Sequence, residues 1–281
     1  VLLQIGKHSF DRTTTPGPLA DRWLLSRLTE MTTEVTEAME LYQFDRALKA
    51  IREFSWNVLA DNYIELVKGR LYSDDPGRDS ACRVLWETLD TLCRLMAPFA
   101  PHFSEEVSFY LGEGSVHKKT WPVPGPVDQE ARANGDLLSS LVAAVRNYKH
   151  EHGLALNAPM GQITIFTSRI SDDSGDMARA LNGPVTWEHD RSILEKKPGP
   201  VQFNMAVIGP ALRRDAKTFM DAVRALPHKR LIAPPVAINA GGKEIAVPEG
   251  AFTLTYNYLI GGEEVDIITV DDVIVTIRKN P

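Results

Sequence analysis

The sequence predicts a mainly α-helical bundle over residues 1–159, followed by a small α+β domain over residues 160–281. Up to residue 152 the apolar residues recur three and four positions apart, which is typical of helices with one buried face. After Gly153 the apolar runs become short and alternate with polar residues, which is typical of strands. With 281 residues, 43% of them hydrophobic, the chain is long enough to form two domains.

The first predicted helix has an apolar face and an acidic face. Its apolar residues lie three and four positions apart, and glutamates occupy the opposite side. The apolar face consists of Leu24, Leu28, Met31, Val35, Ala38 and Tyr42, and the acidic face of Glu30, Glu34 and Glu37. This pattern predicts a surface helix that packs on the core through one side.

Four more helices are expected in the first part of the chain. A long helix covers residues 47–68, and the next one stops at Pro98, because proline cannot continue a helix. A short helix begins at Ser104, and the last long helix spans about residues 128–152. Gly153 is placed to end it, since glycine readily adopts the left-handed conformation of a helix terminus. Together these helices predict a bundle.

The second part of the chain is predicted to mix strands with one helix. The helix is expected over about residues 211–226, and the strands over residues 163–166, 201–208, 252–258 and 273–277. Near the start of the predicted helix lie Arg213, Arg214 and Lys217, which would be able to reach an RNA phosphate or else remain solvated surface charges.

The long helix over residues 47–68 carries a second stripe besides its apolar one. At about 100° per residue, cations and aromatic side chains fall within roughly 60° of one another on this stripe. Cations suit phosphates and flat rings suit unpaired bases, so the stripe predicts a surface for single-stranded RNA. The alternative is a half-buried structural face with snorkelling cations. The RNA-binding candidates from this geometry are Lys49, Arg52, Trp56, Tyr63 and Arg70.

Four segments of the first part carry a family resemblance. They read LADRWLLSRL from residue 19, ALKAIREFSWNVLADNYIELVK from residue 47, LMAPFAPHFSEE from residue 95, and WP at residues 121–122. In this order they resemble the anticodon-binding helical domain of class I aminoacyl-tRNA synthetases of the valyl, isoleucyl and leucyl branch. The resemblance implies a helical bundle that binds the anticodon stem-loop of a tRNA, and it is dense from residue 19 to residue 159.

A fifth segment, VRNYKHEHGLALNAP at residues 145–159, narrows the resemblance. It is similar to the valyl members of the branch, and the lack of a heptad pattern near the C-terminus favours the archaeal type. An isoleucyl-type enzyme remains an alternative, as does a helical docking module that binds no RNA. The likeness adds four RNA-binding candidates, Asn57, Asp61, Arg146 and Lys149.

The resemblance also implies what the chain lacks. Class I synthetases activate the amino acid with a His-x-Gly-His turn and a Lys-Met-Ser-Lys-Ser-like loop, and neither string occurs in the 281 residues. We therefore expect a C-terminal fragment without catalytic residues or cofactor. The parent enzyme would ligate valine to its tRNA with ATP and Mg²⁺ on a catalytic body, and tRNA and that body are the expected partners.

Charge and composition add four expectations. The formal net charge of −6 opposes RNA binding, but residues 46–70 balance at +2, so weak and salt-sensitive affinity is expected. Cys82 and Cys93 lie about 16 Å apart along one predicted helix, too far for a disulfide, and reduced thiols suggest the cytoplasm. No apolar run approaches the ~20 residues of a membrane span. His150 and His152 are spaced to point apart, so no metal site is expected.

Overall fold

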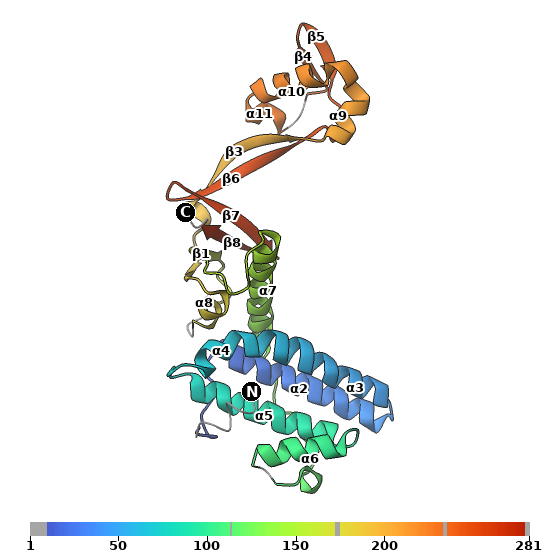
Figure 1. Cartoon of the computed structure of the whole chain (residues 1–281), viewed down its shortest axis with the longest axis vertical. Coiled ribbons are helices and arrows are strands. Elements are labelled where there is room, and N and C mark those ends of the chain that lie inside the picture. The colour runs from blue at the N-terminus through green and yellow to red at the C-terminus, as the bar shows by residue number, and fades with distance from the viewer. Residues whose placement is uncertain (1–9, 113, 172–174, 233–234, 279–281) are drawn as a thin grey trace. The chain divides into compact units, whose positions relative to one another are not determined.

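The computed structural model describes residues 10–112, 114–171, 175–232 and 235–278. The chain divides into two compact units, the first comprising residues 1–189 with 268–275 and the second residues 190–267 with 276–281 (Figure 1). A helical bundle is followed by a smaller mixed part with strands, as the sequence predicts. The domain limits at residues 159 and 160 stay a prediction, and the first compact unit extends beyond them to His189.

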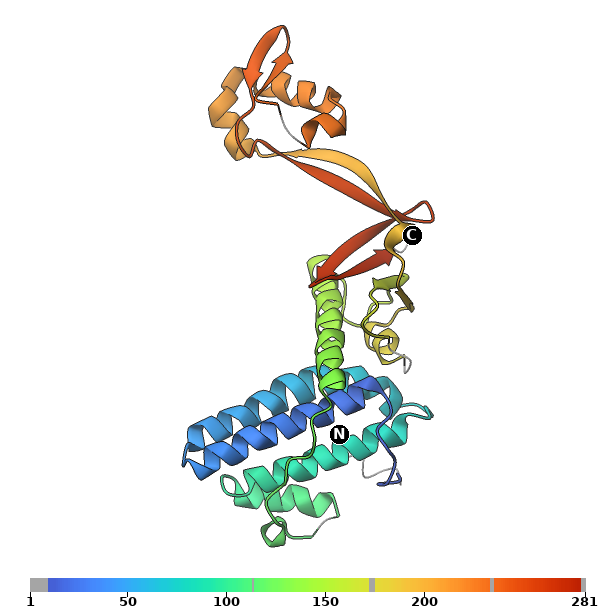
Figure 2. The same cartoon turned by 180° about the vertical axis from the view of Figure 1, so that it is seen from behind.

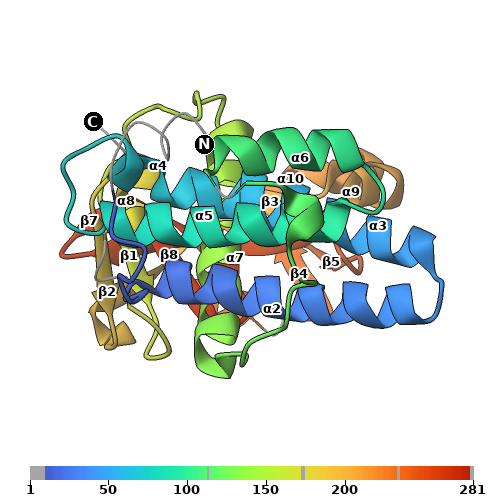
Figure 3. The ribbon, with the colours of Figure 1, turned by 90° about the horizontal axis from the view of Figure 1, so that it is seen from below.

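The bundle lies in the first unit. Its helices are α2 (Leu19–Glu40), α3 (Phe44–Glu53), η1 (Phe54–Ile64), α4 (Glu65–Leu71), α5 (Arg78–Met96), α6 (Pro101–Tyr110) and α7 (Gln129–Glu151), with a short 3₁₀ turn η2 (Val116–Lys118). Helices α2, α3 and α5 run side by side, and α7 crosses them (Figures 1 and 3). The described helices include none that is long and apolar enough to cross a membrane.

The predicted apolar face of α2 is buried, with the exception of its last member. Leu24 and Val35 have no solvent exposure, whereas Tyr42 is 81% exposed. The reason is that α2 ends at Glu40 and the chain turns at Tyr42, whose φ of 57° lies in the left-handed region. Helix periodicity therefore no longer applies at this residue.

The predicted long helix over residues 47–68 is continuous but not uniform. It consists of α3, η1 and α4, and the middle segment η1 is a π-helix. A π-helix closes hydrogen bonds between residues five apart, so each residue turns by roughly 80° instead of about 100°. Side chains on the two ends of the long helix therefore do not follow one regular helical wheel.

The last long helix ends as the sequence predicts, and its start is capped. The Asp128 side chain accepts a hydrogen bond from the amide of Ala131 at 2.9 Å, which satisfies one free donor of the first turn of α7. After Glu151 the chain leaves the helix at Gly153, whose φ is 65°. The proline-rich segment before α7 contacts α2, since Trp121 donates to the Thr36 hydroxyl at 2.9 Å.

The first unit also contains a strand-helix-strand element after the bundle. Strand β1 (Ile163–Phe166) and strand β2 (Val185–Glu188) pair in parallel, with Ile163 opposite Val185, and α8 (Asp176–Leu181) connects them. All four residues of β1 are buried. The parts of β7 (Glu263–Val270) and β8 (Val273–Arg278) that belong to this unit extend the sheet in the order β2-β1-β8-β7.

The second unit is built on a long two-stranded ribbon. Strand β3 (Leu194–Phe203) pairs antiparallel with β6 (Phe252–Ile260), with an irregularity between Pro198 and Val201 (Figure 2). The short 3₁₀ turn η3 (Arg191–Ile193) precedes β3. Between β3 and β6 the chain forms α9 (Met205–Leu212), η4 (Arg213–Asp215), α10 (Ala216–Ala225), α11 (His228–Leu231) and the β4–β5 hairpin (Ala237–Ala240, Lys243–Ala246). Its core includes Ile208, Phe219, Val223 and Leu231, all fully or almost fully buried.

The strand predictions for the second part are correct in three of four cases. Strands β1, β6 and β8 lie where alternation predicts them. The predicted strand over residues 201–208 is wrong beyond Phe203, because Asn204 caps a helix by accepting from the amide of Ala206. The predicted helix over residues 211–226 is divided in the structure among the end of α9, η4 and α10.

Candidate nucleic-acid interface

The predicted RNA-binding residues separate into an exposed group and a buried group. Lys49, Arg52, Trp56, Asn57 and Asp61 are exposed, and Arg146 is partly exposed. Tyr63, Arg70 and Lys149 have no solvent exposure at all. The structure thus keeps the first part of the predicted stripe as a surface and places the second part in the interior.

Tyr63 and Arg70 are held by the carboxylate of Asp21. The Tyr63 hydroxyl donates to Asp21 Oδ1 at 2.8 Å, and the Arg70 guanidinium donates to both oxygens of the same carboxylate, at 2.7 and 3.1 Å. Ser80 donates to this carboxylate as well. Arg70 also contacts Asp176 Oδ1 at 2.9 Å. Both predicted contacts to RNA are therefore corrected, because these side chains bind within the protein.

This buried network shifts two pKa values. Burial, with Asp21 as the second cause, raises the pKa of Tyr63 well above its ordinary value, so the phenol stays protonated. Burial acts to lower the pKa of Arg70, but the hydrogen bond to Asp21 and the charges of Asp21 and Asp176 raise it overall. Arg70 is therefore a fixed positive charge between two carboxylates.

Lys149 is also corrected from a ligand contact to a structural one. Its ammonium donates to the backbone carbonyls of Leu156, Ala158 and Leu181 at 2.9, 2.8 and 2.8 Å. Burial lowers the pKa of Lys149, with Arg146 as a smaller cause. Within the first unit this one side chain holds the loop after α7 and the end of α8.

The π-helix explains why the stripe splits. Trp56 and Tyr63 are seven residues apart, which puts them on one side of an α-helix. Over these seven residues the smaller turn per residue of η1 adds up to a difference of roughly 130°. Trp56 is consequently 68% exposed, whereas Tyr63 is buried. Apolar spacing offers no signal that distinguishes such a π-helix from an α-helix.

The exposed group begins with three side chains on consecutive turns of α3 and η1. Lys49 lies 3.9 Å from Glu53, an ion pair between exposed side chains that has little energetic weight. Arg52 and Trp56 follow three and seven positions later, both exposed. We call Lys49, Arg52 and Trp56 the cation-aromatic strip. An exposed cation and an exposed aromatic ring on neighbouring turns suit a phosphate and an unpaired base.

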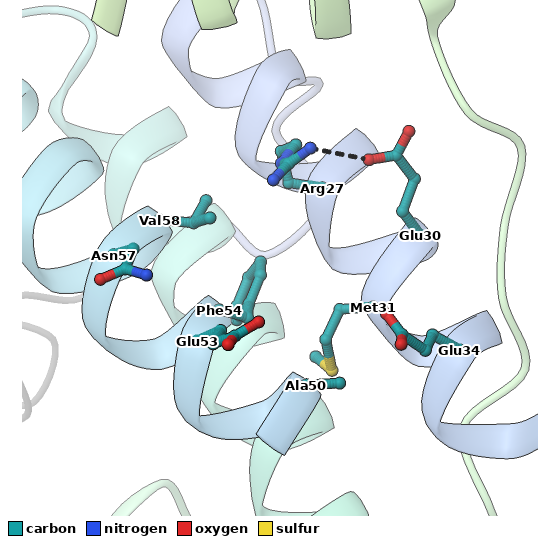
Figure 4. A pocket seen from close by; sticks show the side chains of 9 residues that line it. All are labelled: Arg27, Glu30, Met31, Glu34, Ala50, Glu53, Phe54, Asn57 and Val58. Atoms are coloured by element: carbon teal, nitrogen blue, oxygen red, sulfur yellow. Dashed lines mark hydrogen bonds and ion pairs between the residues drawn. The ribbon is translucent and has the colours of Figure 1, made fainter. Parts of the chain in front are cut away.

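Asn57 lies in a groove between α2 and the long helix (Figure 4). The groove has a volume of about 270 Å³, and its lining residues are Arg27, Glu30, Met31, Glu34, Ala50, Glu53, Phe54, Asn57 and Val58. Arg27 donates to Glu30 at 3.2 Å within it. Because three carboxylates face one guanidinium, the groove repels phosphate. Carboxylate and amide oxygens instead accept hydrogen bonds from the amino groups on base edges.

Asp61 and Arg146 line a second cavity, of about 560 Å³, within the first unit. Its lining residues are Ala60, Asp61, Glu65, Lys68, Arg146, Leu156, Asn157, Arg179, Ala180 and Asn182. Arg146 donates to the Asp61 carbonyl at 3.4 Å and lies 3.5 Å from Glu65. The structure therefore brings together two candidates that lie 85 residues apart in the sequence.

Arg52 also lines an apolar groove, which was not expected from the sequence. It measures about 560 Å³, and its lining residues are Leu48, Ile51, Arg52, Ser55, Leu59, Leu89, Leu92, Cys93, Met96, Phe103, Ser104 and Val107. Leu48, which belongs to the apolar stripe of the predicted long helix, is 38% exposed at this groove, and Phe103 is 68% exposed. Apolar periodicity identifies such residues as buried, but it cannot reveal that a groove between helices is left open.

The fold and these surfaces define a helical-bundle recognition module with an attached mixed α+β unit. A sequence model of the anticodon-binding domain of tRNA ligase matches residues 21–165, which is more than half of the chain. The chain belongs to this family. The family predicted from the motifs at residues 19–28 and 145–159 is thereby confirmed.

Curated archaeal proteins that carry the name valine–tRNA ligase match most of the chain. The enzyme of Methanosarcina barkeri is 40% identical over 268 residues, which cover 93% of this chain and 31% of that protein. For Archaeoglobus fulgidus the identity is 36% over 266 residues, covering 92% and 31%. The chain spans about a third of the length of these curated relatives. The similarity also extends beyond residue 159, where the sequence motifs alone become sparse.

Proposed function

We propose that this chain binds the anticodon stem-loop of a valine-accepting tRNA. The observation that carries the proposal is the cation-aromatic strip of Lys49, Arg52 and Trp56, exposed on a helix of a domain from the anticodon-binding family. Relatives that cover over nine-tenths of the chain and are named valine–tRNA ligase support valine over isoleucine.

The exposed residues would divide the work of recognition. Lys49 and Arg52 position phosphates, and the open ring of Trp56 stacks on an unpaired base. Asn57 reads a base edge from the rim of its acidic groove, where acceptor oxygens favour bases with an amino group. Asp61 and Arg146 make a second contact at the cavity they share.

The chemistry of ligation would take place outside these 281 residues. The parent enzyme joins valine to its tRNA with ATP and Mg²⁺ in the cytoplasm, and this chain contributes recognition without catalytic residues of its own. We also propose that the bundle docks on the catalytic body of that enzyme. The apolar groove beside Arg52 supports this second role, because open apolar side chains such as Leu48 and Phe103 gain stability when a partner covers them.

A salt titration tests the first proposal. The chain is titrated with a transcript of valine-accepting tRNA and with the same transcript carrying a swapped anticodon. Anticodon recognition gives weaker binding to the swapped transcript, with log affinity falling linearly in log salt. Equal binding to both transcripts would leave only phosphate contact, and no binding at low salt would favour a pure docking module.

Substitutions then locate the surface. Arg52→Ala and Trp56→Ala are each expected to weaken binding and to reduce the preference for the correct anticodon. Lys118→Ala is the matched control, because Lys118 is an exposed lysine of the same unit outside the strip. If Lys118→Ala weakens binding as much as Arg52→Ala, the strip is not the recognition surface.

A further inference from the structure

The second unit contains a basic segment in an otherwise acidic protein. Residues 194–232 contain eight lysines and arginines against three aspartates and glutamates, a formal balance of +5, whereas the whole chain carries −6. This excess is larger than the +2 of residues 46–70 in the first unit. We therefore predict that this segment of the second unit attracts a polyanion more strongly than residues 46–70 do. The anticodon contacts proposed for the bundle assign no function to the second unit.

Part of this charge lies on the β3–β6 ribbon beside two tyrosines. In the antiparallel register Lys196 is opposite Tyr258, and Pro198 is opposite Tyr256. Alternate residues of a strand point to the same side, so Lys196, Tyr256 and Tyr258 share one face of the ribbon. The Lys196 ammonium lies 3.8 Å from the ring centre of Tyr256 and 5.9 Å from that of Tyr258.

The short helix α11 borders the same face. The ring of His228 meets that of Tyr256 edge-on, with 5.2 Å between the centres and 73° between the planes. Lys229 and Arg230, which follow in α11, are exposed. The tyrosines are half-buried, so they do not belong to the closed core of the unit. We call Lys196, His228, Tyr256 and Tyr258 the ribbon face; Lys229 and Arg230 follow His228 in the sequence as further exposed cations.

A purely structural explanation accounts for only part of the ribbon face. Strand β3 is an edge strand, and lysines and prolines on an edge prevent pairing with other chains. This explains Lys196 and Pro198. It does not explain two half-exposed tyrosines on the neighbouring strand, with the His228 imidazole added from α11.

We propose that the ribbon face is a second RNA-binding surface, which contacts the tRNA backbone and stacks on its accessible bases without reading the anticodon. Alternating cations and flat rings are the arrangement that binds nucleic acid without sequence preference. The inference rests on the proposed binding of tRNA by this chain. It differs from that proposal in one measurable property, because the ribbon face adds affinity equally for any anticodon.

The test uses the whole chain and the two transcripts, with correct and swapped anticodons. Lys196→Glu is expected to weaken binding to both by the same factor, roughly tenfold, and to lower the slope of log affinity against log salt by about 1. Lys243→Glu is the matched control, since Lys243 is an exposed lysine of the β4–β5 hairpin in the same unit, and it should change neither quantity.

Tyrosine substitutions test stacking separately from charge. The double substitution Tyr256→Ala, Tyr258→Ala is expected to weaken binding roughly 5- to 150-fold for both transcripts, and Tyr256→Phe, Tyr258→Phe to retain it, because phenylalanine keeps the ring. Thermal unfolding of each variant shows whether the unit is folded. Lys196→Glu changes an exposed side chain and so gives a result even if the alanine variant does not fold.

The outcomes separate the two proposals. If the ribbon variants bind like the unsubstituted chain while Trp56→Ala abolishes anticodon preference, the ribbon inference is overturned and the proposed function stands. If the ribbon variants lose anticodon preference without losing overall affinity, the surface has a different role and the inference is likewise overturned. Equal loss for both transcripts, with the preference intact, supports it. If the unsubstituted chain binds neither transcript, both proposals fail.

Discussion

Arg70 of α4 and Asp176 of α8 form a buried ion pair with 2.9 Å between Nε and Oδ1, although they lie 106 residues apart in the sequence. The same guanidinium binds Asp21 of α2 through two oxygens. One side chain thus connects three helices of the first unit. Since both side chains of the pair are about 1% exposed or less, removing one partner leaves an uncompensated charge in the interior.

Arg70→Ala is therefore expected to lower the free energy of unfolding by roughly 3–5 kcal/mol. Unfolding of the first unit by denaturant measures this decrease in the free energy of unfolding. The matched control is Arg78→Ala, since Arg78 pairs with the fully exposed Asp74 and should contribute no more than about 1 kcal/mol. Similar losses in the two variants would mean that the buried network has no special weight.

The raised pKa of Tyr63 predicts that the stability of the folded protein depends on pH in the alkaline range. Above the ordinary tyrosine value of about 10, the unfolded chain releases the phenolic proton while the folded protein keeps it. The contribution of the protonated Tyr63 phenol to the free energy of unfolding is therefore complete below pH ~10. Above that pH the contribution falls by about 1.4 kcal/mol per pH unit.

Tyr63→Phe should remove this part of the alkaline fall, as seen by comparing unfolding free energies of the variant and the unsubstituted chain between pH 9 and about 11.5. The control is Tyr72→Phe, because Tyr72 is 70% exposed and should leave the profile unchanged. An identical alkaline fall in Tyr63→Phe would contradict a protonated phenol in the network.

Trp56 and Trp23 allow a contrast between recognition and stability. Trp56→Ala should weaken tRNA binding by roughly 1–3 kcal/mol and change the unfolding free energy by no more than about 0.5 kcal/mol, since its ring is 68% exposed. Trp23→Ala should cost roughly 3–5 kcal/mol of stability, because Trp23 is 2% exposed and donates to Asp136 at 2.8 Å. A large stability loss in Trp56→Ala would identify Trp56 as a packing residue.

Gly135 of α7 permits the close approach of Trp23 of α2. A Cβ atom at residue 135 would lie 2.2 Å from the indole ring, so Gly135→Ala is expected to lower stability by roughly 1–3 kcal/mol despite the better helix propensity of alanine. Gly209→Ala is the control, because a Cβ there meets no atom within 4 Å. If Gly135→Ala raises the melting temperature instead, α2 and α7 are less closely packed than described.

Local patterns predict this fold well where helices obey one periodicity. The buried face of α2, the end of α7 at Gly153 and the strand β1 follow directly from apolar spacing and terminal residues. The limits of β3 and α9 do not, because the chain passes from strand to helix at Asn204 within one apolar run. Periodicity cannot separate two elements in such a run.

The candidate site could be predicted only in part, for a related reason. Lys49, Arg52 and Trp56 lie before or at the start of η1 and are exposed as the helical wheel requires. Tyr63 and Arg70 lie after the change in winding and are buried. Their partners Asp21 and Asp176 come from distant segments, and spacing within one helix contains no information about them.

The π-helix also sets the phase between the two ends of the long helix. Deleting one residue between Phe54 and Ile64 would allow this segment to wind more like an α-helix, and everything that follows would rotate by about 100°. Arg70 would then turn away from Asp21 while Trp56 stayed in place. The proposed recognition surface and the buried network thus occupy one continuous helix, and its change in winding decides which side chains are exposed and which are buried.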